Sequence, residues 1–167
     1  NLKFFIDNGI FESNDVDFYI TINGYKCSLD IPEYKNVTIL RKINKCYDIG
    51  RHGEIISKIN KNNYKYFVFL NSSIRGPYKK NNESWVDIFT SKINNLVKLV
   101  GVNKSDWKNL HIQSMLFVTD RIGLDIILPA LTCKKNHDDA VNNGELKISK
   151  LITDRGFKLD SMINTHF

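Results

Sequence analysis

One polar cluster lies between Arg41 and Ile56, in the sequence RKINKCYDIGRHGEII, and its residue types can bind an anion or a nucleoside. It follows a predicted strand and opens a predicted helix, where backbone amides and the positive end of the helix dipole favour negative charge. Its candidate ligands are Asn44, Asp48 and Arg51. Asp48 either accepts hydrogen bonds from a ribose or a base, or caps the helix, and Arg51 is either a ligand or a surface residue. The sequence alone leaves both alternatives open.

A second cluster ends the apolar run YKYFVFLNSSIRGPY, which extends from Tyr64 to Tyr78. Asn71 and Ser73 stand where the run stops, and Arg75 follows them. The planar guanidinium of Arg75 can pair with a phosphate, whereas the uncharged Asn and Ser side chains are weak ligands for a hard cation. The same residues can also form an ordinary turn in which Asn and Ser side chains bond to their own backbone.

Carboxylates and a histidine form the remaining candidates. Asp138 and Asp139 lie seven and six residues before Glu145, which is predicted to begin a helix. The helix dipole stabilises a carboxylate at that place, and the same carboxylate can act as a general base. His111 and Gln113 lie two residues apart, on one face of a predicted strand. A single histidine is more often structural than catalytic, and no partners for a Ser/His/Asp arrangement are evident.

The hydrophobic periodicity alternates between helical and extended segments. Helices are expected near residues 2–10, 51–62, 85–96, 122–128 and 145–154, and strands near 16–22, 37–40, 64–70, 97–100, 112–118 and 157–163. Strands separated by helices favour βαβ units, and hence an α/β fold whose sheet is mostly parallel with helices on both faces. In such sheets ligands bind beyond the carboxyl ends of the strands, where Asp48 and Asn71 are expected.

Composition narrows the class of protein and of partner. The chain has 167 residues, 42% of them hydrophobic, as expected for a single globular domain over residues 1–167. No apolar run reaches the roughly 18 residues that span a bilayer, so no membrane span is expected. The net charge of +6 favours anionic partners, but the scattered lysines indicate a solvated surface rather than a nucleic-acid groove.

The cysteines predict an intracellular protein. Cys27, Cys46 and Cys133 are odd in number and far apart in the sequence, and they form no CxxC motif. We therefore expect reduced thiols and a cytoplasmic location. The chain begins at Asn1 rather than Met, which is consistent with a fragment.

Several phrases of the sequence resemble a glycosyltransferase domain of the GT-A type, and in particular uncharacterised glycosyltransferase-like proteins related to rhamnan synthesis. These phrases are YFVFLNSSIRGP, VKLVG, HIQSMLFVTDRIGL and ITDRGFKL. Inverting members of the group have an asparagine-containing loop that opens a helix, then a hydrophobic strand ending in a DXD-like triplet, then an acidic segment leading into a helix. The order here is Asn44…Asp48-Ile49-Gly50, FVFLNSS and Glu145…Asp154-Arg155-Gly156-Phe157. The resemblance covers nearly the whole chain from Leu2 onward.

The resemblance implies a GT-A-like (Rossmann-like) fold whose first strand lies upstream of Asn1 or is missing. It also implies a role in polysaccharide biosynthesis, in which a sugar passes from a nucleotide-sugar donor to a hydroxyl of a glycan acceptor with inversion. Glu145 would be the base that deprotonates this hydroxyl. The donor would be bound by Asn44, Asp48, Arg51, Asn71, Ser73 and Arg75. The acceptor or the diphosphate would lie near His111, Gln113, Asp138 and Asp139.

The DXD position of this sequence carries no aspartate, since Asn71, Ser72 and Ser73 occupy it. A Mn²⁺ or Mg²⁺ ion would have to bind near Asn71 without the usual carboxylates, so no metal ligand is assigned. Arg75, Arg51 or a lysine would then neutralise the diphosphate. The missing aspartates leave a second interpretation, a catalytically degenerate module that binds a glycan or a nucleotide. A basic nucleic-acid-binding domain is a weaker one, because the aromatic residues occupy core-like positions rather than a stacking surface.

Overall fold

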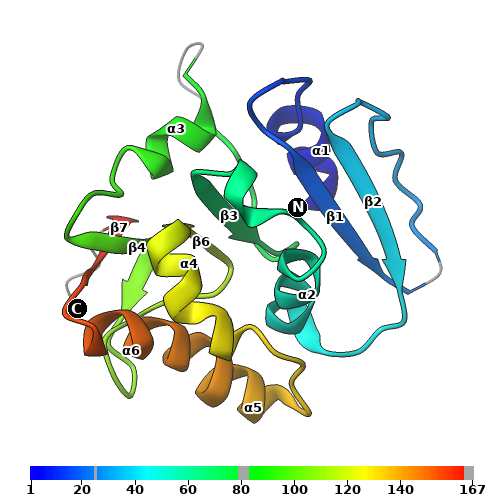
Figure 1. The fold of residues 1–167 in the computed structure, drawn as a ribbon. Helices are drawn as coiled ribbons and strands as arrows, with labels where there is room; N and C mark the ends of the chain where they lie inside the picture. Colours follow the sequence, from blue (N-terminus) through cyan, green and yellow to red (C-terminus); the bar gives the residue numbers. More distant parts are fainter. Residues whose placement is uncertain (25, 79–82, 164–167) are drawn as a thin grey trace.

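The computed structural model describes residues 1–24, 26–78 and 83–163, and a five-stranded sheet forms its centre (Figure 1). Strand β6 lies between β3 and β4 and is antiparallel to both. Strand β5 is antiparallel to the end of β4, and β7 is parallel to β4. The strands are β3 (Tyr66–Leu70), β4 (Val97–Ser105), β5 (His111–Ile112), β6 (Leu116–Asp120) and β7 (Lys158–Ile163).

The prediction of a mostly parallel, GT-A-like (Rossmann-like) sheet is therefore wrong. In the described part of the five-stranded sheet, β4 and β7 are the parallel pair and the other pairings are antiparallel. The reason lies in the connection between β4 and β5. Ser105 pairs with His111, so only residues 106–110 join the two strands. A parallel neighbour needs a crossover of about a dozen residues or more, and this hairpin therefore inserts the β5–β6 segment antiparallel to β4.

A second, two-stranded sheet lies beside the first (Figure 1). Strands β1 (Phe18–Asn23) and β2 (Val37–Lys42) are parallel, with a register that runs from Phe18 opposite Val37 to Asn23 opposite Lys42. Phe18 contributes to the core beneath the larger sheet, together with Ile6 and Ile10 from the first helix and its end.

Each face of the five-stranded sheet is buried against other elements. On one face Phe67, Leu99 and Phe117 pack against α2 (Tyr47–Ile56), α4 (Arg121–Ile127) and α6 (Leu146–Asp154). On the other, Val100 and Val118 pack with α1 (Leu2–Gly9), β1 and α3 (Trp85–Thr90). This burial on both sides explains why β3 and β6 read as continuous hydrophobic runs.

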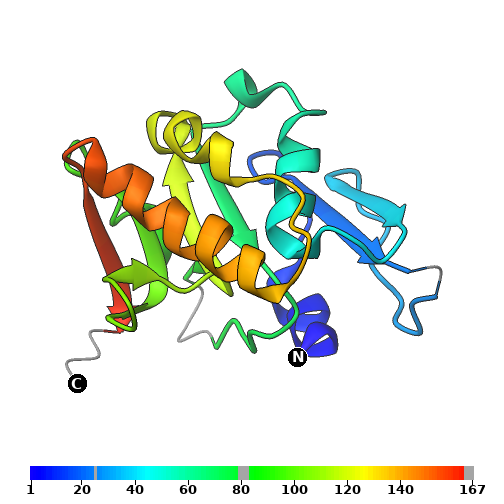
Figure 2. The same cartoon turned by 90° about the horizontal axis from the view of Figure 1, so that it is seen from below.

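Two irregular segments interrupt the regular elements. Four residues of β4, from Gly101 to Lys104, lie opposite six from Ile112 to Phe117, so two extra residues bulge between β5 and β6. We call this segment the 113–115 bulge. The second irregularity is a π-helical turn, η3 (Val141–Glu145), between α5 (His137–Ala140) and α6. Figure 2 shows α5, η3 and α6 as one continuous run of helix. β-bulges and π-helical turns both occur often at functional sites.

Candidate functional site

Three of the predicted donor residues meet at the carboxyl end of β3. Asn71 donates its side-chain N–H to Asp48 Oδ2 over 2.6 Å, and Asn71 Oδ1 accepts the backbone N–H of Ser73 at 3.0 Å as well as the Ser73 hydroxyl. Asp48 Oδ1 accepts the N–H of Ile49 at 2.9 Å. The structure thus joins Asp48, Asn71 and Ser73 into one hydrogen-bonded group, the Asp48–Asn71 cluster.

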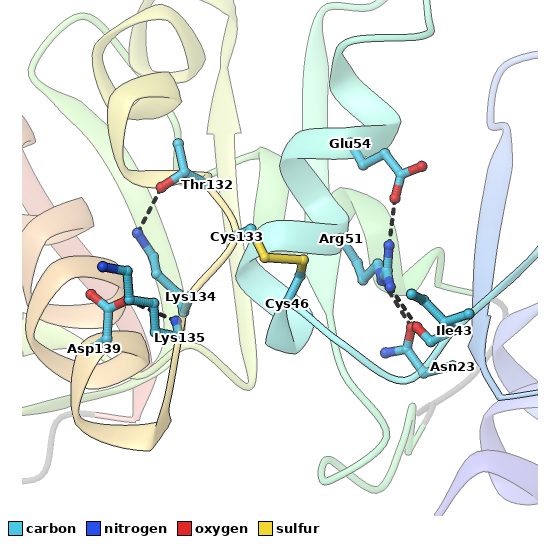
Figure 3. Close-up of a disulfide and its surroundings, with 10 residues drawn as sticks. All are labelled: Asn23, Ile43, Cys46, Arg51, Glu54, Thr132, Cys133, Lys134, Lys135 and Asp139. Atoms are coloured by element: carbon cyan, nitrogen blue, oxygen red, sulfur yellow. Dashed lines mark hydrogen bonds and ion pairs between the residues drawn. A yellow bond between two sulfur atoms is a disulfide. The ribbon is translucent and has the colours of Figure 1, made fainter.

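A disulfide between Cys46 and Cys133 holds the helix that carries Asp48 (Figure 3). Cys46 directly precedes α2 and has a left-handed backbone with φ of 72°. The prediction of reduced thiols is wrong for this pair, because a sequence separation of 87 gives no sign that the two cysteines lie close together. Cys27 is free and half-buried. Since disulfides persist mainly in oxidising compartments, the cysteines no longer support a cytoplasmic location.

Two glycines let α2 approach the segment that carries Cys133. A Cβ atom at Gly53 would lie 1.8 Å from the carbonyl oxygen of Leu131, and one at Gly50 would lie 2.8 Å from Cys133 Cα. Both obstacles are backbone atoms, so neither position has room for a side chain. The glycines and the disulfide together fix the start of α2, and hence Asp48, against residues 131–133.

Arg51, a predicted donor residue, is buried and engaged in internal contacts (Figure 3). Its guanidinium donates to Asn23 Oδ1 at 3.0 Å, to Glu54 Oε2 at 2.7 Å and to the Ile43 carbonyl at 2.5 Å. These bonds connect the ends of β1 and β2 to α2. Lys42, Lys58 and Arg51 surround Glu54, and their hydrogen bonds, led by that of Lys42, lower the pKa of Glu54 to about 2.

The other two predicted donor residues of these loops, Asn44 and Arg75, are exposed. Asn44 lies in the bend between β2 and α2. The guanidinium of Arg75 lies over the ring of Phe4 at 4.5 Å, and its Nε donates to the Tyr78 hydroxyl at 2.8 Å. A positive charge is therefore held on the chain that leaves β3.

Glu145 and His111, both predicted near the reaction, form a second group. Glu145 Oε2 accepts the backbone N–H of Ser114 at 2.6 Å, and Oε1 lies 3.4 Å from His111 Nε2. His111 Nδ1 lies 2.7 Å from the carbonyl oxygen of Asn109, which can only accept, so Nδ1 carries a hydrogen. Nε2 is the ring nitrogen that faces the carboxylate. We call these two residues the Glu145–His111 pair.

The helix predicted from Glu145 is found as α6, with Glu145 as its N-cap, but other helical turns precede it. Glu145 is the last residue of η3 and lies inside a helical run that starts at His137. The π-helical turn, rather than a helix dipole, therefore sets its position. The side chain of Glu145 is 19% exposed and that of His111 is 2% exposed, so Glu145 is the member of the pair that a ligand can reach.

The 113–115 bulge joins the two groups. The carbonyl oxygen of Met115 accepts the backbone N–H of Asn71 at 3.1 Å, and the preceding residue, Ser114, donates to Glu145. The extra residues of the bulge free the Ser114 N–H from the β-ladder and point it at the carboxylate. Gln113 has another role, because its Oε1 accepts a hydrogen bond from Asn103 at 2.6 Å.

Asp138 and Asp139 serve the start of α5. Asp139 accepts the N–H of Lys135 at 2.9 Å and the side chain of Asn143 at 2.8 Å, and these bonds, above all that of Lys135, lower the pKa of Asp139. Asp138 is exposed, with an oxygen 3.9 Å from His137 Nδ1. These contacts are local to α5, and none of them joins the Glu145–His111 pair.

Buried Lys134 and half-buried His52 are two further groups near the site that were not among the predicted site residues. Lys134 donates to Thr132 Oγ1 at 2.9 Å (Figure 3) and to the Asn143 carbonyl at 2.8 Å, and burial lowers its pKa. His52 lies against Phe69, and its buried Nε2 has no hydrogen-bond partner among the described residues. The spacing of Asp48 and His52, one helical turn apart, is the signal that could have placed His52 at the site.

The residues at the end of β3 do not form the ligand set that a hard divalent cation prefers. Ca²⁺ and Mg²⁺ take carboxylate and carbonyl oxygens, whereas the Asp48 carboxylate and the Asn71 amide oxygen already accept hydrogen bonds here. Across residues 1–24, 26–78 and 83–163, no three His, Cys, Asp or Glu side chains gather as a metal site. None of the helices in these ranges is long and apolar enough to cross a membrane.

The candidate site therefore consists of the Asp48–Asn71 cluster, the Glu145–His111 pair and the 113–115 bulge between them. The Asp48–Asn71 cluster lies at the end of β3. The Glu145 carboxylate is held by the Ser114 N–H and by the buried imidazole of His111. Comparisons of the chain with protein-family models, with curated proteins and with solved structures find no match.

Proposed function

We propose that the protein is an inverting glycosyltransferase that moves a sugar from a nucleotide-sugar donor to a hydroxyl of a glycan acceptor. The observation that carries the proposal is the 113–115 bulge, which accepts from Asn71 through Met115 and donates to Glu145 through Ser114. The Asp48–Asn71 cluster, which suits a donor, thus contacts Met115. The Glu145 carboxylate, which suits an acceptor, contacts the preceding residue, Ser114. The phrases of the sequence that resemble glycosyltransferases support the same reaction.

Glu145 is the general base of the proposed reaction. Its carboxylate takes the proton of the acceptor hydroxyl while the hydroxyl oxygen forms a bond to the anomeric carbon of the donor. The bond between that carbon and the diphosphate breaks, and the leaving nucleoside diphosphate keeps the electron pair. The Ser114 N–H and His111 orient the carboxylate, which is the positioning that general-base catalysis requires.

The donor lies along the Asp48–Asn71 cluster in this proposal. Asp48 accepts hydrogen bonds from the nucleoside, and Asn71 and Ser73 lie beside the diphosphate. The leaving diphosphate gains negative charge, which a nearby cation stabilises. Arg75 supplies that cation, because its guanidinium is exposed and held by Phe4 and Tyr78.

Substitution of Glu145 tests the proposal. Calorimetric titration with UDP, GDP and dTDP sugars is expected to show binding of at least one donor to the wild-type protein. The Glu145→Gln variant keeps an oxygen for the Ser114 N–H but cannot take a proton, so it is expected to bind that donor and to lose transfer by about a thousandfold or more. Asp138→Asn, which removes an exposed carboxylate outside the site, is the matched control and keeps full transfer.

Two results contradict the proposal. The wild-type protein binds none of the nucleotide sugars, or Glu145→Gln transfers sugar at the wild-type rate. The second result would remove Glu145 from the role of base even if transfer itself is real.

A non-catalytic module that binds a nucleotide or a glycan is the second candidate. The observation in its favour is that the Asn71 side chain already donates a hydrogen bond to Asp48 at the end of β3. Asn71, Ser72 and Ser73 also stand where the DXD aspartates of a transferase are expected. Donor binding that is equal in the wild-type protein and in Glu145→Gln, with no transfer by either, would identify this function.

A further inference from the structure

An exposed loop with two large apolar side chains connects β4 and β5. It comprises residues 106–110, and Trp107 and Leu110 are 56% and 59% exposed there. The other tryptophan of the chain, Trp85, is buried and donates its indole N–H to the Gly9 carbonyl at 2.9 Å. Trp107 is thus a large aromatic surface that the core does not use.

Hydrogen bonds hold this loop in a defined conformation. The backbone N–H of Trp107 donates to Ser105 Oγ at 3.2 Å, and that of Asn109 donates to the Trp107 carbonyl at 2.9 Å. Lys108 adopts a left-handed backbone with φ of 64°, a conformation that a residue with a side chain takes only when its surroundings impose it. The indole is therefore presented on a shaped loop rather than on a free tail.

The same loop is tied to the turn that carries Glu145. Lys108 Nζ lies 4.5 Å from the centroid of the Trp107 ring and donates to Asn142 Oδ1 at 3.1 Å. Asn142 belongs to η3, three residues before Glu145. At the other end of the loop, the Asn109 carbonyl orients His111, which faces Glu145. Two contacts thus join the loop that carries Trp107 to η3 and to His111, which position the proposed base.

We propose that Trp107 is the stacking surface for the acceptor sugar. The face of an aromatic ring carries negative potential, which suits the polarised C–H groups on the apolar face of a sugar ring. The Lys108 ammonium lies over one face of the ring, so the sugar stacks on the opposite face, and Asn142 supplies a hydrogen-bonding group for the hydroxyls. The role of the bound sugar as an acceptor rests on the proposed function, whereas the binding of a sugar by Trp107 does not.

Sugar binding by three variants tests this inference. The wild-type protein is applied to an array of neutral oligosaccharides, and the ligands that it retains are titrated as free compounds by calorimetry. Trp107→Ala is expected to weaken binding about tenfold or more, the loss of roughly one stacking contact, and Trp107→Phe to stay within about threefold because it keeps an aromatic face. Leu96→Ala removes a side chain that is also 59% exposed but lies outside the loop, and it binds as the wild type does. Indole fluorescence shifts on titration in the wild-type protein and not in Trp107→Phe.

The outcomes separate this inference from the proposed function. If nucleotide sugars bind but no oligosaccharide does, or if Trp107→Ala binds oligosaccharides as well as the wild type, the inference is overturned and the proposed function stands. If oligosaccharides bind through Trp107 and no nucleotide sugar binds, the sugar site stands and the transferase fails. If the wild-type protein binds phosphatidylcholine–phosphatidylserine vesicles, Trp107→Ala does not, and no oligosaccharide binds, the loop contacts membranes instead. Circular dichroism of each variant confirms that it is folded.

Discussion

His52 is a half-buried histidine that the structure keeps neutral at ordinary pH. Its ring centroid lies 5.1 Å from that of Phe69 and 6.2 Å from that of Phe117. Burial lowers the pKa of His52 from its usual 6.5 to about 4, and the negative charge of Asp48 opposes this shift only in part. Between these two pH values the unfolded chain binds a proton at His52 that the folded protein does not bind.

We therefore predict that the free energy of unfolding falls as the pH decreases from about 6.5 to about 4. The loss attributable to His52 amounts to about 3 kcal/mol at most, and it does not increase further below the folded pKa. His52→Phe, which keeps an aromatic ring beside Phe69, removes this contribution. Urea unfolding of both proteins across this pH range measures it, and equal slopes for the two proteins would contradict the neutral state.

The predicted site residues differ in whether the folded protein places them at the candidate site or uses them in internal contacts. Asn71 and Ser73 lie directly after β3, as the sequence predicts, whereas Asp48 lies in α2 and reaches Asn71 only through the packing of α2 beside β3. Arg51 was expected at the same place, but its guanidinium faces Asn23, Ile43 and Glu54. The sequence around an arginine at the start of a helix does not show whether its guanidinium binds a ligand or another part of the protein.

At the scale of elements, α2 is held at its beginning by a covalent bond. The disulfide from Cys46 to Cys133 closes a loop of the chain across a separation of 87 residues, and Gly50 and Gly53 allow the close packing beside it. A cross-link of this kind lowers the entropy of the unfolded chain. It also fixes the start of the helix that positions Asp48, two residues after Cys46.

Loss of this disulfide is predicted to lower both stability and donor binding. Cys133→Ser is expected to reduce the free energy of unfolding by about 2–5 kcal/mol and to weaken the binding of the nucleotide sugar. Denaturant unfolding and calorimetry measure the two effects.

Dithiothreitol provides the matched control for this prediction. It should destabilise the wild-type protein and leave Cys133→Ser unchanged. Equal sensitivity of the two proteins to the reductant, or equal stability without it, would show that the cross-link does not support α2.

The elements themselves follow the sequence closely, whereas their pairing does not. Strands were expected near 64–70 and 157–163 and are found at Tyr66–Leu70 and Lys158–Ile163. The segment expected as one strand near 112–118 is broken by the 113–115 bulge. Hydrophobic periodicity involves residues that are close in the sequence, so the strands can be predicted from it. A bulge depends on how β5 and β6 pair with β4, and the periodicity holds no information on that pairing.

At the scale of the molecule, the two sheets differ in how well they are enclosed. Strand β6 lies between β3 and β4, and Val118 and Thr119 have no exposed surface. Strand β2 pairs with β1 within the described chain, and Thr38, Ile39 and Arg41 are exposed on it. Arg51 ties the ends of this smaller sheet to α2.

We predict from this contrast that the backbone amides of β6 exchange with deuterium most slowly, through global unfolding, and those of β2 at least about a hundredfold faster through local opening. Hydrogen exchange resolved by NMR measures both rates. Arg51→Ala should speed exchange in β1 and β2 more than in β6. Equal protection of β2 and β6 would mean that the two sheets open as one unit.

The sequence by itself determined where most of the helices and strands form, which segments are apolar, and that polar side chains follow β3. These properties arise from side-chain periodicity and from the chemistry of neighbouring residues. The tertiary structure alone decided that β6 enters between β3 and β4, that Cys46 meets Cys133, that Arg51 faces inward, and that Glu145 and Asn71 share the 113–115 bulge. The physical reason is that each of these contacts joins residues that are distant in the chain, and its free energy depends on a packing that no local pattern specifies.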